Sequence, residues 1–168
     1  MFLKEEEFAQ LVSISPLISI DICILNDDKL LLGKRKNSPA KNFYFVPGGR
    51  IRKNESIDCA VDRLLREELG LKFKENKKNK KKFIGIFEHF YGENFLENSL
   101  FDTHYVVIAF LIRYENIEEI FNLADFHDQH SKYIWYDFVD TDNKELEIHN
   151  YSQDYLEYIS NNIYKKRY

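Results

Sequence analysis

The segment "GRIRKNESIDCAVDRLLREELGL", residues 49–71, contains the most informative helical pattern in the chain. At about 100° per residue, its apolar side chains fall on one face that spans an arc of roughly 180°. Ser56 precedes the pattern and Gly70 ends it, as is typical of helix boundaries. We therefore expect an amphipathic helix over about residues 56–70.

One charged residue of this helix lies on the apolar face. With Ile57 set at 0° around the helix axis, Glu68 falls at about 20°, in the middle of the apolar face. Glu67 lies at the edge of this face and can pair with Arg63 four residues earlier. A carboxylate buried without a partner is strongly unfavourable. From the helix alone two interpretations stay open: a buried salt bridge or an early helix end that exposes Glu68, or a hard divalent cation, which prefers oxygen ligands.

The composition indicates one folded domain over residues 1–168. The chain is 44% hydrophobic, 15% aromatic and 31% charged, as is typical of globular proteins. No apolar run approaches the roughly 20 residues that cross a bilayer, and the N-terminus lacks a signal-peptide pattern, so we expect a cytoplasmic protein without membrane contacts. The net charge of −4 gives no indication of nucleic-acid binding, and the lysine-rich segment 72–82 is interpreted as a solvated loop.

The remaining elements follow from local patterns. A short helix over residues 4–14 precedes a hairpin over residues 17–34, whose two apolar runs are joined by the turn-forming "NDD". The stretch "FYFVPGGRI" is expected as a short strand that breaks at Pro47. Further strands are predicted at 83–91, 104–113 and 132–138, with a last helix over about 152–163. This order predicts an α+β fold, an α/β/α sandwich with a mixed sheet flanked by helices.

The spacing within residues 49–71 resembles the Nudix box, G-x5-E-x7-R-E-U-x-E-E-x-G-U, where U is an aliphatic residue. The segment matches at every specified position except Leu64, where the box has glutamate. A glycine pair permits a tight loop whose carbonyl can face a metal, Glu55 can hold Arg63, and the helix supplies a metal carboxylate. Leu64 removes one member of the usual carboxylate cluster, which argues against cleavage of a phosphoanhydride with several metal ions.

Gln129 and His130 are candidates for the missing chemistry. They lie side by side in "DFHDQHSKYIW", residues 125–135, which is interpreted as a polar loop between two apolar strands. A histidine near its ordinary pKa can take a proton from water at neutral pH, and a glutamine oxygen can ligate magnesium. An ordinary surface turn is the alternative.

Four more residues stand out against their surroundings. Asp21 interrupts the apolar run "LISIDICIL", and His89 lies in the strand pattern "FEHFYGENF", where a purely structural role is the alternative. Arg35 and Arg50 flank the glycine loop, where a pyrophosphate would need cations.

Over nearly its whole length the chain resembles the GDP-mannose mannosyl hydrolase branch of the Nudix hydrolases. The resemblance is carried by the box with Leu64 and by "MFLKEEEFAQLVSISPLISID", "LLLGKR", "FVPGGR", "EHFYGENF", "THYVVIAF" and "DQHSKYIW". That family replaces the box glutamate found here as Leu64. It binds one magnesium ion, for which manganese is a substitute, and breaks the bond between sugar C1 and oxygen.

The resemblance implies a role for each matching position. The metal ligands would be the Gly48 carbonyl, Glu68 and Gln129. The catalytic residues would be His130 as general base, with Arg35 and Arg50 stabilising the departing GDP. The substrate-binding residues would be Tyr105 at the pyrophosphate and Asp21 and His89 at the sugar.

These roles imply hydrolysis of GDP-mannose or a related GDP-hexose to GDP and free sugar, by attack of water at the anomeric carbon with inversion. The resemblance also implies a homodimer. One alternative is a Nudix pyrophosphatase that cleaves a P–O bond of a nucleoside diphosphate derivative. Another is a non-catalytic module that only binds a nucleotide or a protein.

Overall fold

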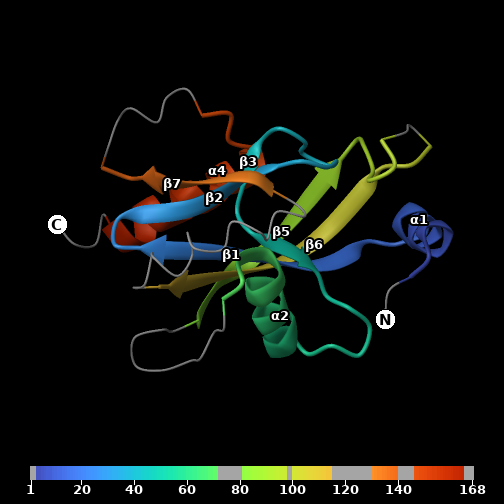
Figure 1. Ribbon diagram of the computed structural model, residues 1–168, viewed down its shortest axis with the longest axis horizontal. Coiled ribbons are helices and arrows are strands. Elements are labelled where there is room, and N and C mark those ends of the chain that lie inside the picture. Colours follow the sequence, from blue (N-terminus) through green and yellow to red (C-terminus); the bar gives the residue numbers. More distant parts are fainter. Residues whose placement is uncertain (1–2, 72–80, 98–99, 115–129, 140–145, 165–168) are drawn as a thin grey trace.

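A seven-stranded mixed sheet forms the centre of the protein (Figure 1). The structure, a computed structural model, describes residues 3–71, 81–97, 100–114, 130–139 and 146–164. Its strands are β1 (Leu17–Asn26), β2 (Lys29–Arg35), β3 (Tyr44–Phe45), β4 (Gly48–Arg50), β5 (Lys81–Tyr91), β6 (Thr103–Arg113) and β7 (His130–Asp137). Its helices are α1 (Glu5–Ile14), α2 (Ile57–Leu69) and α4 (Asn150–Ile159), the last followed by a π-helical turn, Ser160–Tyr164.

The strand order is β3-β2-β1-β6-β5, while β4 pairs with β1 and β7 pairs with β2. Strands β1 and β6 run parallel, and the other pairs are antiparallel. The predicted hairpin is confirmed: β1 and β2 pair through Leu25 with Leu30 and through Asn26 with Lys29. Asp27 in the connecting turn has a φ of 45°, as tight two-residue hairpin turns require.

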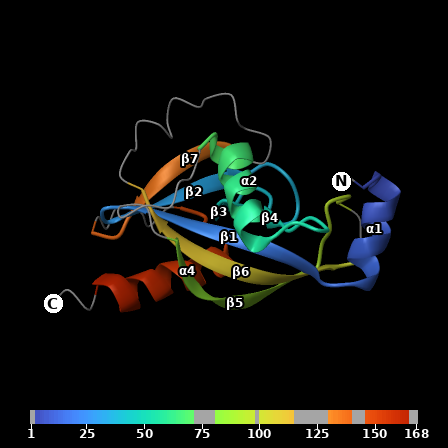
Figure 2. The ribbon, with the colours of Figure 1, turned by 90° about the horizontal axis from the view of Figure 1, so that it is seen from below.

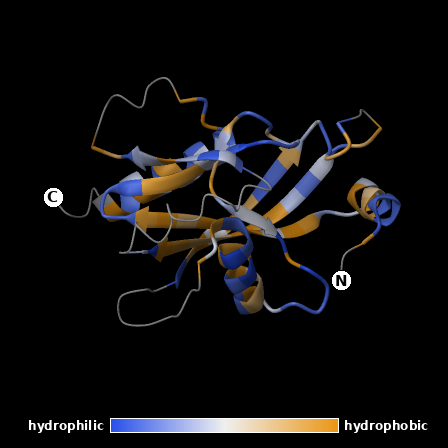
Figure 3. Cartoon of the chain, viewed as in Figure 1, coloured by the Kyte–Doolittle hydropathy of each residue, from blue (hydrophilic) through white to orange (hydrophobic). Residues whose placement is uncertain are grey.

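Alternation along the central strands gives the sheet two apolar faces. Ile20, Ile22 and Ile24 of β1 join a core under α2, whereas Cys23 and Leu25 join a second core under α4. Figure 2 shows α2 and α4 on opposite sides of the sheet, with α1 at one end. Figure 3 shows that β1 and β6 are largely hydrophobic, as expected for strands covered on both faces. The predicted α/β/α sandwich is confirmed.

Helix α2 has the boundaries that its sequence predicts. The Ser56 side chain accepts a hydrogen bond from the Cys59 backbone N–H at 3.2 Å, and Gly70 ends the helix in the left-handed conformation with a φ of 62°. The buried residues are Ala60, Val61, Arg63, Leu64, Leu65, Glu68 and Leu69. The apolar face is therefore confirmed, and Glu68 lies on it.

Three local predictions need correction. The stretch around Pro47 forms two strands and not one, because β3 pairs with β2 while β4 pairs with β1. Between the two strands, the Pro47 carbonyl accepts a hydrogen bond from the Ile22 backbone N–H. His130 is not in a loop but begins β7, opposite Arg35 of β2. The last α-helix begins at Asn150 and ends at Ile159, two residues earlier and four residues earlier than the predicted range of about 152–163.

Among the described residues, no helix is both long and apolar enough to span a bilayer.

Candidate functional site

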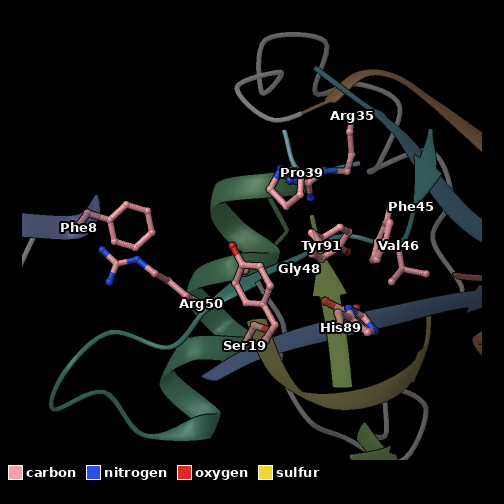
Figure 4. A pocket seen from close by; sticks show the side chains of 13 residues that line it. Phe8, Ser19, Arg35, Pro39, Phe45, Val46, Gly48, Arg50, His89 and Tyr91 are labelled. Carbon is pink, nitrogen blue, oxygen red and sulfur yellow. The ribbon is translucent and has the colours of Figure 1, made fainter. Parts of the chain in front are cut away.

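A cavity of about 230 Å³ lies at the end of the sheet near α1, and its lining residues Phe45, Val46 and His89 belong to the side that α4 covers. Figure 4 shows the side chains that line it. Six of the predicted site residues line it: Asp21, Arg35, Gly48, Arg50, His89 and Tyr105. They come from β1, β2, β4, β5 and β6, so the sheet itself brings them together. The volume is below the range of about 300–1,000 Å³ typical of small-molecule pockets. The cavity can therefore enclose only part of a larger ligand.

Asp21 is a buried acid in this cavity. Its Oδ2 accepts a hydrogen bond from the Tyr155 hydroxyl at 2.8 Å. Burial raises the pKa of Asp21 to about 7, although the Tyr155 hydrogen bond and the charge of Arg35 oppose this shift. Because Asp21 lines the cavity, its carboxyl group can form a hydrogen bond with a hydroxyl of a ligand.

His89 is a neutral hydrogen-bonding group. It is buried, its ring stacks on Tyr151 with centroids 4.0 Å apart and planes at 6°, and its Nε2 lies 3.4 Å from the Tyr155 hydroxyl. Burial lowers the pKa of His89 to about 3, and nearby His149 adds to the effect. The imidazole therefore stays uncharged near neutral pH, which suits it to binding hydroxyls.

Two cations line the cavity without a carboxylate partner in the described part of the chain. The Arg35 guanidinium lies over the Phe45 ring at 5.9 Å, and its buried Nε has no hydrogen bond to any described residue. The Arg50 guanidinium lies 4.6 Å from the centre of the Phe8 ring. Figure 4 shows these two side chains next to each other. Tyr105 lies near both arginines; burial raises the pKa of its hydroxyl, and the two charges oppose this. Together they can bind a diphosphate.

Glu68 and His130 form a second buried cluster on the α2 side of the sheet. Glu68 is 7% exposed and His130 is 1% exposed. His130 Nδ1 lies 3.2 Å from Glu68 Oε2 and 3.0 Å from the Tyr133 hydroxyl. The same hydroxyl donates to the Glu68 backbone carbonyl at 3.1 Å. Gly33 makes room for the imidazole, since a Cβ there would lie 2.5 Å from His130 Cδ2.

The contacts of His130 determine which nitrogen carries its proton. The one proton of the Tyr133 hydroxyl points to the Glu68 carbonyl, so the hydroxyl oxygen and the Glu68 carboxylate both accept from Nδ1. In the neutral ring, Nε2 then carries the lone pair. Nε2 is buried and has no hydrogen bond to the described residues. This nitrogen can accept a proton.

Arg63 fastens α2 to the loop before it. Its guanidinium holds both oxygens of Glu55, at 2.6 and 2.9 Å, and Glu67 at 3.0 Å. It also donates to the Arg50 carbonyl at 3.0 Å. The hydrogen bonds from Arg63 lower the pKa of Glu55 to about 2. Both predicted pairings of Arg63 are confirmed.

Gly48 and Glu68 are oxygen donors suited to a divalent cation. Asp21 and Gly48 face each other as a non-hydrogen-bonded pair, because the bonds of the β1–β4 ladder run from Ile22 to Pro47 and from Ile51 to Ile18. The Gly48 carbonyl therefore points away from β1, to the edge on which Arg63 of α2 binds. Glu68 keeps a second carboxylate oxygen beside its contact with His130. These hard donors fit a hard divalent ion.

The predicted site residues thus fall into two groups. Six line the cavity, whereas Glu68 and His130 contact each other on the α2 side and do not line it. Gly48 belongs to the cavity, and its carbonyl lies on the strand edge near α2. Gln129 lies outside the described residues.

Sequence reasoning missed the residues that support these groups. Tyr151 and Tyr155 of α4 contact His89 and Asp21, and Tyr133 of β7 contacts His130. A spacing of four places Tyr151 and Tyr155 on one face of the predicted C-terminal helix, which could have signalled a shared role. Nothing in the sequence indicates that this face meets positions 21 and 89.

The chain matches the model of the NUDIX domain over residues 16–157. It is 36% identical over 108 residues to the low-salt glycan biosynthesis protein Agl8 of Haloferax volcanii, covering 64% of this chain and 65% of that protein. It is 43% identical over 56 residues to an ADP-ribose pyrophosphatase of Methanocaldococcus jannaschii, 33% of each. Both matches span less than two thirds of these relatives.

Solved structures share the fold at low identity. The MutT NUDIX hydrolase of Burkholderia pseudomallei superposes with a TM-score of 0.63 at 20% identity, over 86% of this chain and 98% of that chain. The MutT protein of Methanosarcina mazei gives a TM-score of 0.62 at 20% identity, over 89% and 98%. The family match covers most of the sequence and the helix that carries the box has the expected structure, so the chain belongs to the NUDIX domain family.

Proposed function

We propose that this Nudix hydrolase converts GDP-mannose or a related GDP-hexose to GDP and free sugar, by attack of water on the anomeric carbon with inversion. One observation carries the proposal: Glu68 of α2 lies 3.2 Å from His130 of β7. The same helix has Leu64 where the Nudix box has glutamate. Leu64 is 2% exposed and packs in the core below α2. It supplies no carboxylate, which favours a histidine base over a glutamate base.

In the proposed reaction, His130, which pairs on β7 with the cavity residue Arg35 of β2, accepts a proton from the attacking water through Nε2. Asp21 and His89 bind hydroxyls of the hexose. Arg35, Arg50 and Tyr105 bind the diphosphate, which already is a good leaving group and needs charge neutralisation more than protonation. The Gly48 carbonyl, Glu68 and Gln129 would hold a magnesium ion, or manganese in its place, which supplies further positive charge for the leaving group.

The relatives support two readings of the chemistry. The Haloferax volcanii relative is named for glycan biosynthesis, which fits a sugar-nucleotide substrate. The Methanocaldococcus jannaschii relative is named as an ADP-ribose pyrophosphatase, which favours cleavage of a P–O bond as the second candidate. Leu64 favours the first reading, because it removes a carboxylate from the box.

Hydrolysis in oxygen-18 water separates the two reactions. Purified protein is incubated with GDP-mannose and magnesium, and the products are analysed by mass spectrometry. Label in the released sugar supports the proposal, while label in a phosphate product would refute it in favour of the pyrophosphatase. Proton NMR of the first sugar anomer to form tests inversion.

The proposal includes a homodimer. Helix α1 stands at the end of the sheet (Figure 2) and contacts the body through Phe8, whose ring meets Phe95 at 4.8 Å. Such a position leaves much of α1 accessible to a second copy. Light scattering after size exclusion should give twice the chain mass, and the mass of one chain would contradict the dimer.

A further inference from the structure

Helix α4 contributes a buried hydroxyl that contacts two residues lining the cavity, Asp21 and His89. Tyr155 is 0% exposed, and its ring packs edge-on against Phe87 with centroids 4.9 Å apart. Its hydroxyl lies between Asp21 Oδ2 at 2.8 Å and His89 Nε2 at 3.4 Å. A buried hydroxyl with two polar neighbours from different strands couples those neighbours.

The direction of these hydrogen bonds is determined by their donors. When Asp21 is ionised, the Tyr155 hydroxyl donates its one proton to the Asp21 carboxylate, so its oxygen can only accept from His89. His89 Nε2 therefore carries the ring proton. The other ring nitrogen, Nδ1, is left with the lone pair and can accept a hydrogen bond from a ligand.

The two oxygens of the Asp21 carboxylate have different neighbours. Oδ2 is held by α4, whereas Oδ1 lies over Gly48, since a Cβ on Gly48 would come within 2.5 Å of it. Gly48 lines the cavity. One carboxylate oxygen is therefore anchored, and the other remains for a ligand.

A second tyrosine of the same helix face fixes the ring of His89. Tyr151 stacks on it, and the Tyr151 hydroxyl bonds the Phe90 backbone twice, donating to the carbonyl at 2.8 Å and accepting from the N–H at 2.7 Å. Helix α4 thus holds β5 at the residue next to His89. The position of the ring and the choice of its protonated nitrogen are set by two residues four apart.

We propose that Tyr155 is a positioning residue for sugar recognition, whose hydroxyl orients Asp21 and His89 toward the hydroxyls of the hexose. This rests on the proposed function and deepens it, because it assigns sugar selectivity to a helix outside the box. Recognition of a hydroxyl by an oriented donor and acceptor discriminates strongly between sugars that differ at that hydroxyl. Binding of GDP alone does not use this contact.

The test is Tyr155→Phe, which keeps the buried ring and removes only the hydroxyl. We expect kcat/KM for the preferred GDP-sugar to fall about 10-fold to 100-fold, and the preference over an epimeric GDP-sugar to fall about 10-fold. Inhibition by GDP should change less than about 2-fold. The ratio between two sugars is independent of the fraction of folded enzyme, so a loss of stability cannot imitate the effect.

Tyr158→Phe is the matched control. Tyr158 lies on the same helix and packs against the same core, and its hydroxyl has no hydrogen bond to a described residue. This variant should keep the kcat/KM and sugar preference of the wild type. An equal change in both variants would assign the effect to the helix as a whole and would overturn the role of Tyr155.

A second measurement, NMR spectroscopy of His89, does not depend on turnover. Long-range proton–nitrogen correlation spectra should show His89 protonated at Nε2 in the wild type and a shifted tautomer balance in Tyr155→Phe. Unchanged His89 signals together with an unchanged sugar preference would overturn the proposal while leaving the proposed function intact. A wild type that hydrolyses no nucleotide sugar would refute the proposed function, and with it a role in sugar selectivity.

Discussion

The polar residues on the α2 side of the sheet and those on the α4 side are held by different interactions. On the α2 side, Arg63 binds Glu55 and Glu67 through charged groups that lie within one stretch of sequence. On the α4 side, Asp21 and His89 are held by Tyr155 and by stacking, and burial raises the pKa of Asp21 and lowers the pKa of His89. The first arrangement is built by local ion pairs, and the second by tertiary burial.

This difference separates two kinds of sensitivity. Ion pairs respond to the loss of one charge, and those with an exposed partner such as Glu67 also respond to salt. Buried neutral groups respond to protonation and to the loss of a hydrogen-bond partner. The two sides of the sheet should therefore lose function and stability under different conditions.

The largest expected effect is on the α2 side, at His130. Replacing it with glutamine removes the proposed base, so turnover should fall roughly 100-fold to 10,000-fold while GDP binding is kept. His104→Gln is the matched control, since His104 stacks on Phe90 outside the cavity. Steady-state kinetics and calorimetric GDP titration check both variants. A near-normal turnover of His130→Gln would remove that residue from the role.

Glu55→Gln tests the ion pairs of the same side. Because the pKa of Glu55 is lowered from 4.5 to about 2, its carboxylate stabilises the fold fully above pH 4.5 and loses this contribution as the pH falls toward 2. The variant should lose about 1–3 kcal/mol near neutral pH, and this difference should shrink below pH 4.5. Urea unfolding across this range measures it.

The control for this change is Glu157→Gln, on the exposed face of α4. A surface substitution of this kind should stay within about 0.5 kcal/mol of the wild type at every pH. A difference for Glu55→Gln that did not depend on pH would argue against the ion pair as its cause.

His89→Gln tests the α4 side through a different pH window. The pKa of His89 is lowered from 6.5 to about 3, so the folded protein excludes the charged imidazole and loses stability as the pH falls from 6.5 toward 3. Glutamine does not titrate. The stability difference between wild type and variant should therefore be largest near pH 7 and narrow on acidification.

Denaturant unfolding at several pH values checks this expectation. His149 also titrates nearby and Tyr151, Tyr155 and Tyr91 surround the ring, so the comparison is between the two proteins at each pH. A constant difference from pH 7 to pH 4 would show that protonation of His89 does not destabilise the fold.

The smallest effect is expected at Glu67. Its side chain is 42% exposed and pairs with Arg63 at 3.0 Å and with Arg52 at 3.2 Å. Glu67→Gln should cost less than about 1 kcal/mol, and less still at high salt, with turnover nearly unchanged. Thermal melts at low and high salt and a kinetic assay check this. A large loss of turnover would instead indicate that Glu67 contacts the metal.

The helix of residues 57–69 was predictable because its information is local. Helix periodicity places Glu68 among the leucines, Ser56 and Gly70 mark the ends, and spacing pairs Arg63 with Glu55 and Glu67. The strand split at Pro47 was not predictable, because β3 and β4 differ only in which distant strand each one meets. His130 was placed in a loop for the same reason, since its pairing with Arg35 is a long-range contact.

The sequence by itself determined the family resemblance, the amphipathic helix and the place of Glu68 on its apolar face. The helix and the place of Glu68 depend on periodicity within a short segment, where neighbours along the chain are neighbours in space. The roles of the candidate site residues were implied by the resemblance. The tertiary structure alone decided that Tyr155 meets both Asp21 and His89, and that Glu68 meets His130. Such contacts join positions far apart in the chain, and only the packing of helices on the two faces of the sheet brings them within hydrogen-bonding distance.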